Sequence, residues 1–240
     1  MLSFAKENGQ LQDLQELETQ LLGPARRGGA AKPQNEEEQM EYPVNLRIEY
    51  PDRILNRLTS FFRPFMLIPI AIVLSLVSGS VWGREAWSGI LVAGGILFIP
   101  TVLMLLFRRK YPRWWFDWNI NLTKFSLRVA SYAALLTDVY PSTDQEQAVS
   151  VEIPYPKVAQ LKTGLPLVKW FLAIPHYIVL AFLILAAIVV TLIAWLAILF
   201  TGTYPEGLFN YVVGVMRWCL RVQAYAFLLV TDLYPPFRLN

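Results

Sequence analysis

Few side chains in this chain are of the types that carry chemistry, and those few lie far apart. His176 is the only histidine and Cys219 the only cysteine. A zinc site needs several such ligands close together, so no metal site is expected. His176 follows Pro175 at the start of a long apolar stretch. That position favours a hydrogen-bonded structural histidine, with a quinone or proton site as the alternative.

No motif for catalysis stands out either. The sequence holds no glycine-rich phosphate loop, nucleophile elbow, carboxylate dyad or pair of haem ligands. Asp138 and Asp232 each lie in a Thr-Asp-x-Tyr-Pro segment at the expected end of a helix. Such aspartates are typical of helix caps or salt-bridge partners. The sequence therefore predicts a protein that is not an enzyme and needs no cofactor.

Two polar stripes recur at helical spacing, and they are the main candidates for binding. Their members are separated by three or four residues, so each stripe lies on one face of a helix. We expect them to contact lipid headgroups, because a basic face near anionic lipid gains about 1 kcal/mol per residue. Pairing with a carboxylate and lining an internal polar cavity are the alternatives. The first stripe is Asp117, Asn121, Lys124 and Arg128; the second is Asn210, Arg217 and Arg221, with Gly214 in the place of Asn121.

Tyrosine–proline pairs mark the ends of the apolar and amphipathic segments. Tyrosine places its ring among acyl chains and its hydroxyl among headgroups, and the following proline disfavours helix for the tyrosine. These pairs are therefore predicted to set the depth and the ends of helices. The expected interfacial anchors are Tyr111, Tyr140, Tyr204 and Tyr234.

The composition predicts a membrane protein. Of the 240 residues, 55% are hydrophobic and only 16% are charged, against about 25% charged in soluble domains. Residues 167–200 form one apolar run, longer than the roughly 20 residues needed to span a bilayer. The net charge of +3 is too small to indicate a nucleic-acid partner.

The chain reads as an extension followed by two repeated modules, residues 42–141 and 142–240. We expect an all-α membrane protein in which each module is an apolar helical hairpin followed by an amphipathic interfacial helix. For the second apolar unit, one long tilted helix is the alternative to a hairpin. Residues 44–51 and 149–156 alternate apolar and polar side chains and are expected to pair as a short β-ribbon at the membrane surface.

Residues 1–41 are predicted to form a soluble extension. A short amphipathic helix at residues 10–22 is either a frayed tail or a docking helix for a partner, because its leucine face is too small to fold alone. No signal peptide is evident, so the N-terminus is expected in the cytoplasm. The positive-inside rule places both basic flanks of the first apolar unit there, Arg53 to Arg63 and Arg108 to Arg113. The docking face would be Leu11, Leu14, Leu17 and Leu21.

Several short segments within residues 149–238 carry a resemblance to a known family. They are Trp170, Ile174-Pro175-His176, Ile193-Ala194-Trp195, residues 197–202, Tyr204-Pro205, Gly207-Leu208-Phe209, Arg217-Trp218, Arg221-Val222, Thr231-Asp232 and residues 234–237. On these residues the second module resembles small bacterial membrane proteins known only as a domain of unknown function. The first module looks like a divergent copy that keeps Ile68-Pro69. The resemblance implies the bacterial cytoplasmic membrane and no reaction.

Three functions fit these patterns. The first is a non-catalytic membrane scaffold or accessory subunit that binds another membrane protein or a second copy of itself. The second is an anionic-lipid-binding or membrane-shaping protein, since each module puts a basic amphipathic helix near one leaflet. The third is a small anion transporter or channel with its two basic stripes facing each other.

Overall fold

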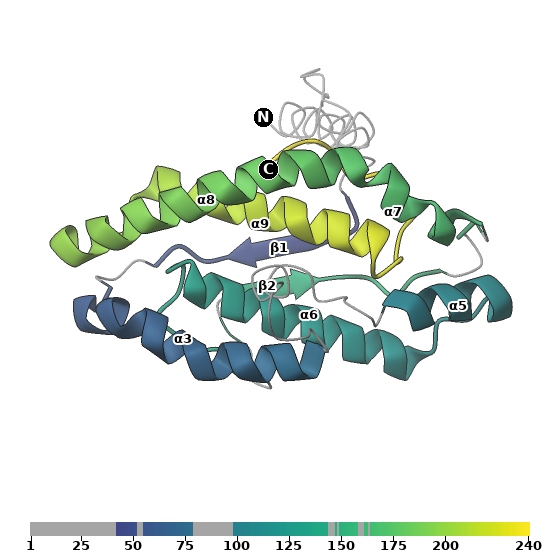
Figure 1. Ribbon diagram of the computed structural model, residues 1–240, viewed down its shortest axis with the longest axis horizontal. Coiled ribbons are helices and arrows are strands. Elements are labelled where there is room, and N and C mark those ends of the chain that lie inside the picture. The colour runs from purple at the N-terminus through teal and green to yellow at the C-terminus, as the bar shows by residue number, and fades with distance from the viewer. Residues whose placement is uncertain are drawn as a thin grey trace, which may run out of the picture. The chain divides into compact units, whose positions relative to one another are not determined.

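The part of the chain that the structure describes is mostly helical and contains a two-stranded sheet, as Figure 1 shows. This computed structural model describes residues 42–51, 55–78, 98–143, 147, 149–157, 161–162 and 164–240. The predicted helix at residues 10–22 lies outside the described residues, and so do residues 79–97 within the first predicted hairpin. In chain order the elements are β1 (Asn45–Ile48), α3 (Arg57–Ser78), α5 (Phe98–Arg108), α6 (Arg113–Ala133), β2 (Val149–Glu152), the 3-10 helix η2 (Leu165–Leu167), α7 (Lys169–Leu172), α8 (Ile174–Thr201) and α9 (Glu206–Ala226).

The expected β-ribbon is present. β1 and β2 pair antiparallel, with Leu46 opposite Val151. Side chains alternate along both strands as the sequence pattern requires: Leu46 and Val151 are buried, whereas Arg47 and Ser150 are exposed. The ribbon packs on α6 through β2 and on α9 through β1, so it lies between the two halves of the fold (Figure 1).

Among the described residues, two helices are long and apolar enough to cross a membrane, α3 and α8. Their most apolar stretches are only 17% and 11% buried within the protein. A core helix of a soluble protein would instead be covered on most sides. At 1.5 Å per residue, α8 is about 42 Å long, which exceeds the roughly 30 Å hydrocarbon layer of a bilayer.

The preference for a hairpin in the second apolar unit was wrong. Residues 174–201 form the single continuous helix α8, preceded by the short α7. The only proline of α8, Pro175, lies in its first turn, where a missing amide donor is harmless. Gly202 then ends the helix in a left-handed conformation with a φ of 80°. The hairpin was inferred from likeness to the first module. The absence of any helix breaker between Pro175 and Gly202 was the better predictor of a single helix.

The two amphipathic helices belong to the protein core and do not expose a wide apolar face. Thirteen of the 21 residues of α6 and fourteen of the 21 residues of α9 are buried. α6 packs between α3 and β2, and α9 packs between α8 and β1 (Figure 1). An apolar stripe in a sequence indicates only that water is excluded. Here protein covers that stripe where lipid was expected.

The C-terminal end of α8 lies beside the start of α3. Trp195 donates from Nε1 to the Ser60 carbonyl at 3.0 Å, and Leu55 donates its amide to the Gly202 carbonyl at 2.9 Å. At the opposite end of α8, η2 contacts α5. Figure 1 shows the starts of α3 and α7 at opposite ends of the helical layers.

This arrangement separates the two basic flanks of the first apolar unit. An ion pair between Arg63 and Asp138 holds the end of α6 at the start of α3. Because α6 has 21 residues, its first residue, Arg113, lies about 30 Å from that point. A membrane crossed by α3 therefore has Arg57 and Arg113 on opposite sides. The positive-inside rule placed both residues in the cytoplasm, and that placement stays a prediction.

Candidate functional site

A buried ion pair joins the start of α3 to the segment that follows α6. The Arg63 side chain is 3% exposed and forms an ion pair with Asp138. The Arg63 guanidinium also donates to the carbonyls of Tyr132 and Thr137, at 3.2 and 2.9 Å, and lies 4.5 Å from the centre of the Tyr132 ring. The backbone amide of Asn56 donates to the second Asp138 oxygen at 3.3 Å. Arg63 and Asp138 thus lock α3 onto the end of α6.

A second buried ion pair has the same design. Nζ of Lys169, the first residue of α7, lies 2.6 Å from the Asp232 carboxylate. Lys169 also donates to the Thr231 carbonyl at 2.7 Å and lies 5.2 Å from the centre of the Tyr225 ring. The backbone amide of Lys162 donates to the other Asp232 oxygen at 2.8 Å. Burial lowers the pKa of Lys169, while Asp232 acts to raise it.

The two arrangements, which we call the ion-pair clasps, match in detail. In each, the aspartate accepts an amide hydrogen from the residue seven positions before its cation. In each, the preceding threonine hydroxyl accepts the amide hydrogen two residues on, at 3.2 Å for Thr137 and 3.1 Å for Thr231. Of the two roles left open for Asp138 and Asp232, helix cap or salt-bridge partner, the structure shows the salt-bridge partner. Arg63 and Lys169 were not identified as their partners from the sequence, although each is a basic residue at the start of an apolar run.

Two tyrosines tie each half of the fold to the other. Tyr50 follows β1, and its hydroxyl donates to the Tyr204 carbonyl at the corner before α9. Tyr155 follows β2 and donates in the same way to the Tyr111 carbonyl before α6. The Tyr50 ring meets Phe209 edge-on at 5.0 Å, and the Tyr155 ring meets Phe116 edge-on at 5.0 Å. The sequence marked these tyrosines as segment ends but could not show that their contacts cross between the halves.

The predicted interfacial anchors divide into two kinds. Tyr111 and Tyr204 are buried within the protein, with 3% and 1% of their surface exposed. Tyr140 and Tyr234 are exposed at 42% and 44%. The position of the first two is explained by ring packing, since Tyr111 meets Phe116 edge-on and Tyr204 meets Phe209 edge-on. Only the second two present a ring to the surroundings.

The basic members of the polar stripes bind backbone carbonyls. Arg128 donates to the Ser142 carbonyl at 2.8 Å, and Arg217 donates to the Leu46 carbonyl of β1 at 3.0 Å. Arg221 donates to the carbonyls of Arg238 and Asn240 at 2.6 and 3.2 Å. Burial, followed by the nearby charges of Arg238 and Arg217, lowers the pKa of Arg221 to about 10. Carbonyl partners were not among the alternatives considered for these guanidiniums.

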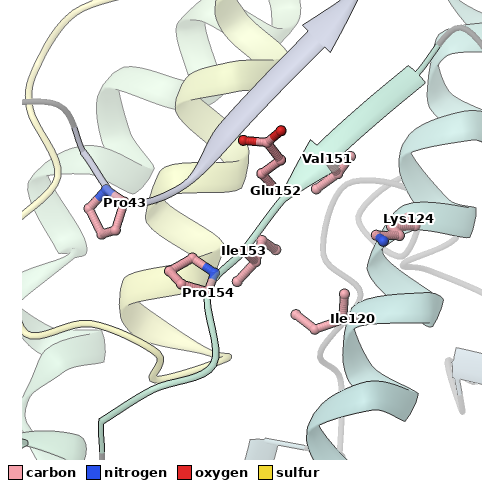
Figure 2. Close-up of a pocket in the computed structure, with 7 residues that line it drawn as sticks. All are labelled: Pro43, Ile120, Lys124, Val151, Glu152, Ile153 and Pro154. Carbon is pink, nitrogen blue, oxygen red and sulfur yellow. The ribbon is translucent and has the colours of Figure 1, made fainter.

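The remaining stripe residues do not come together at one site. Asp117, Asn121 and Asn210 are exposed, and Lys124 is half-buried. Lys124 lines a pocket of about 430 Å³ between α6 and β2, as Figure 2 shows. The other lining residues are Pro43, Ile120, Val151, Glu152, Ile153 and Pro154.

His176 lies in an aromatic cluster at the start of α8. It is fully buried, and its Nδ1 accepts a hydrogen bond from Trp218 Nε1 at 3.1 Å. The Phe237 ring stacks on the imidazole at 4.0 Å, and Tyr234 lies 4.8 Å away. The hydrogen bond predicted for a structural histidine is therefore present. Within the described residues, no group of three or more His, Cys, Asp or Glu side chains is placed to hold a metal ion.

Comparison with known families covers this second half of the chain. Residues 166–238 match the family described as "Domain of unknown function (DUF4389)". The match contains Lys169, His176, Trp218 and Asp232, which are the second ion-pair clasp and the centre of the aromatic cluster. No curated protein and no solved structure matches the chain. The expected resemblance to a family of unknown function is confirmed for these residues, and the family's description assigns no activity.

Proposed function

We propose that this protein is a non-catalytic membrane scaffold or accessory subunit, built from two tandem copies of one module at residues 42–141 and 142–240. One observation carries the proposal. The buried cations of both halves bind within the protein, whereas the surfaces of α3 and α8 that remain exposed are apolar. Such a molecule offers lipid, or another membrane protein, a rigid apolar surface.

The backbone supports the tandem copy. α6 and α9 are both 21 residues long, and each is preceded by a proline in extended conformation, Pro112 and Pro205. After each helix a leucine adopts a positive φ, 64° at Leu135 and 56° at Leu229. L-residues rarely adopt this conformation. Two copies of such a strained turn at equivalent places are best explained by duplication.

The exchanged tyrosines support a single rigid body. Each strand is followed by a tyrosine that packs at the other module's helix start, so neither module has a complete core alone. The ion-pair clasps then hold α3 to α6 and α7 to the segment after α9. Rigidity of this kind suits a protein that positions partners.

The exposed faces of α3 and α8 are the proposed contact surfaces. Large apolar side chains lie exposed along the full length of both helices. Large exposed apolar patches mark sites of membrane or protein interaction. On α3 they include Phe61, Phe65, Ile68, Val73 and Leu76; on α8 they include Ile178, Phe182, Leu185, Val189, Leu192 and Phe200.

The occupied guanidiniums favour this function over anion transport. A transporter would need its cationic stripes free to line a pathway. Arg128, Arg217 and Arg221 instead donate to backbone carbonyls. The family resemblance supports placing the scaffold in the bacterial cytoplasmic membrane.

Site-specific photocrosslinking in native membranes tests the contact surface. A photoreactive residue at Phe182 or Leu192, both exposed on α8, should give a discrete protein adduct at one of these positions. The control is Leu180, which is 6% exposed and faces the protein interior. Lipid adducts alone at every exposed position of α3 and α8 would refute the scaffold.

The N-terminal extension offers a second test of partner binding. We expect deletion of residues 1–41, or the double substitution Leu14→Asp and Leu17→Asp, to weaken co-purification of a partner in mild detergent. The matched control is the double substitution Gln12→Asp and Thr19→Asp, which adds the same charge at positions that helical spacing places opposite the leucines. Equal loss with this control would show that the leucine face is not the docking surface.

A further inference from the structure

The turn between α5 and α6 carries an exposed group of basic side chains, which we call the basic turn. It consists of Arg108, Arg109, Lys110 and Arg113, all exposed. Lys157 is also exposed and follows Tyr155, whose hydroxyl binds the Tyr111 carbonyl within this turn. In the described part of the chain, none of these five basic residues takes part in an ion pair.

Aromatic side chains flank the basic turn. Phe107 is 77% exposed and Trp114 is 69% exposed. Exposed aromatic rings next to lysine and arginine are typical of a surface in the headgroup region of a membrane, where the ring reaches the acyl boundary and the cation reaches phosphate. A nucleic-acid surface would also be basic, but an exposed phenylalanine at the end of an apolar helix favours lipid.

The second half provides a comparison at the matching turn. Gly202 ends α8 with a positive φ of 80°, as Arg109 does after α5 with a φ of 46°. Phe200 is 78% exposed, close to the value for Phe107. The basic residues, however, are absent there: Thr201, Gly202, Thr203 and Glu206 occupy the places of Arg108, Arg109, Lys110 and Arg113. The same backbone turn is therefore cationic at one end of the fold and neutral to acidic at the other.

We propose that the basic turn binds anionic phospholipid headgroups and thereby places this end of the protein at the cytoplasmic leaflet. Each basic residue near an anionic surface is expected to raise binding roughly fivefold. The orientation agrees with the start of the fold. Tyr111 in the basic turn donates to the Leu228 carbonyl and Tyr42 to the Leu233 carbonyl, so residue 42 enters at the same end.

The scaffold function does not depend on this inference, and lipid retention tests it separately. Full-length protein in a neutral detergent is mixed with phosphatidylglycerol or phosphatidylcholine of the same acyl chains, and retained lipid is counted by native mass spectrometry. The test variant combines Arg108→Gln, Arg109→Asn, Lys110→Gln and Arg113→Gln. Asparagine is chosen at position 109 because it tolerates a positive φ. The control variant combines Arg57→Gln and Glu206→Gln at the opposite end.

We expect the wild type and the control to retain phosphatidylglycerol at least tenfold better than phosphatidylcholine, and the test variant to lose that preference. Salt of about 1 M should remove the preference from the wild type too, because the Debye length falls to about 3 Å. This salt arm needs no mutation, so it holds even if the variant folds poorly. An unchanged preference in the test variant or in high salt would overturn the proposal, as would tighter binding of a single-stranded oligonucleotide than of phosphatidylglycerol.

Discussion

Lys169 is a buried cation whose removal should strongly destabilise the fold. Its ammonium is fully buried, and three contacts hold it: the Asp232 carboxylate, the Thr231 carbonyl and the face of Tyr225. Removing one partner of a buried ion pair leaves the other charge without compensation. Lys169→Met should therefore lower the free energy of unfolding by about 3 kcal/mol, measured by thermal unfolding in detergent.

The control for Lys169 is Lys162, whose side chain is exposed while its backbone amide binds Asp232. Lys162→Met keeps that amide and should change stability by less than about 0.5 kcal/mol. Adding Asp232→Asn to Lys169→Met should recover part of the loss, because the unpaired charge is then gone. Equal melting temperatures for Lys169→Met and the wild type would contradict the role of this ion pair.

His176 should behave as a structural residue coupled to Trp218. His176→Phe leaves the Trp218 N–H buried without an acceptor, at an expected cost of about 1–3 kcal/mol. Replacing both partners, with Trp218→Phe added, removes the orphaned donor, so the double variant should be more stable than the two single losses predict. Strict additivity in this double-mutant cycle would contradict the hydrogen bond seen between the two rings.

At the scale of elements, α5 and α8 are each followed by a residue with a positive φ, but the residue types differ. Gly202 adopts a positive φ without cost, whereas Arg109 adopts it with strain. Gly202→Ala should lower the free energy of unfolding by about 1 kcal/mol, and Arg109→Gly should raise it by up to about 1 kcal/mol. Denaturant unfolding of the two variants side by side checks both signs. A stabilising Gly202→Ala would contradict the left-handed helix end.

The tyrosines that cross between the halves make a separate prediction. Tyr50→Phe and Tyr155→Phe each remove a hydroxyl that donates to a carbonyl of the other half. Each should cost about 1 kcal/mol while leaving the ring packing intact. Tyr211→Phe, which removes a contact within the second half to the Leu183 carbonyl, is the matched control. If the crossing contacts couple the halves, only the first two variants should broaden the unfolding transition.

At the scale of the whole molecule, local sequence patterns predicted the helices and strands well. They predicted poorly which of these elements pack against each other. The β-ribbon followed from alternation in residues 44–51 and 149–156, and salt bridges were one of the two roles expected for Asp138 and Asp232 at helix ends. The burial of α6 and α9 did not follow, because an apolar stripe does not reveal whether lipid or protein covers it. The carbonyl partners of Arg217 and Arg221 were equally hidden, since any backbone segment can accept a hydrogen bond.

The path of the chain in the first half of the fold was hidden for a related reason. Charge counting assumes that consecutive apolar segments cross and return, and it cannot detect that α6 runs back alongside α3. The ion pair from Arg63 to Asp138 reveals this geometry, and it joins residues 75 positions apart in the chain. Contacts of such separation are not readable from one sequence. The asymmetry between the basic turn and its match at Gly202 is readable once the two turns are aligned in space.

We propose that this protein holds a partner in the membrane. The most direct test is a gentle native pull-down of the full-length protein, with mass spectrometry of everything that accompanies it. The account predicts one membrane protein, or a second copy of this chain, in stoichiometric amount. Recovery of a monomer with lipid alone would contradict it and would favour the anionic-lipid surface as the principal function.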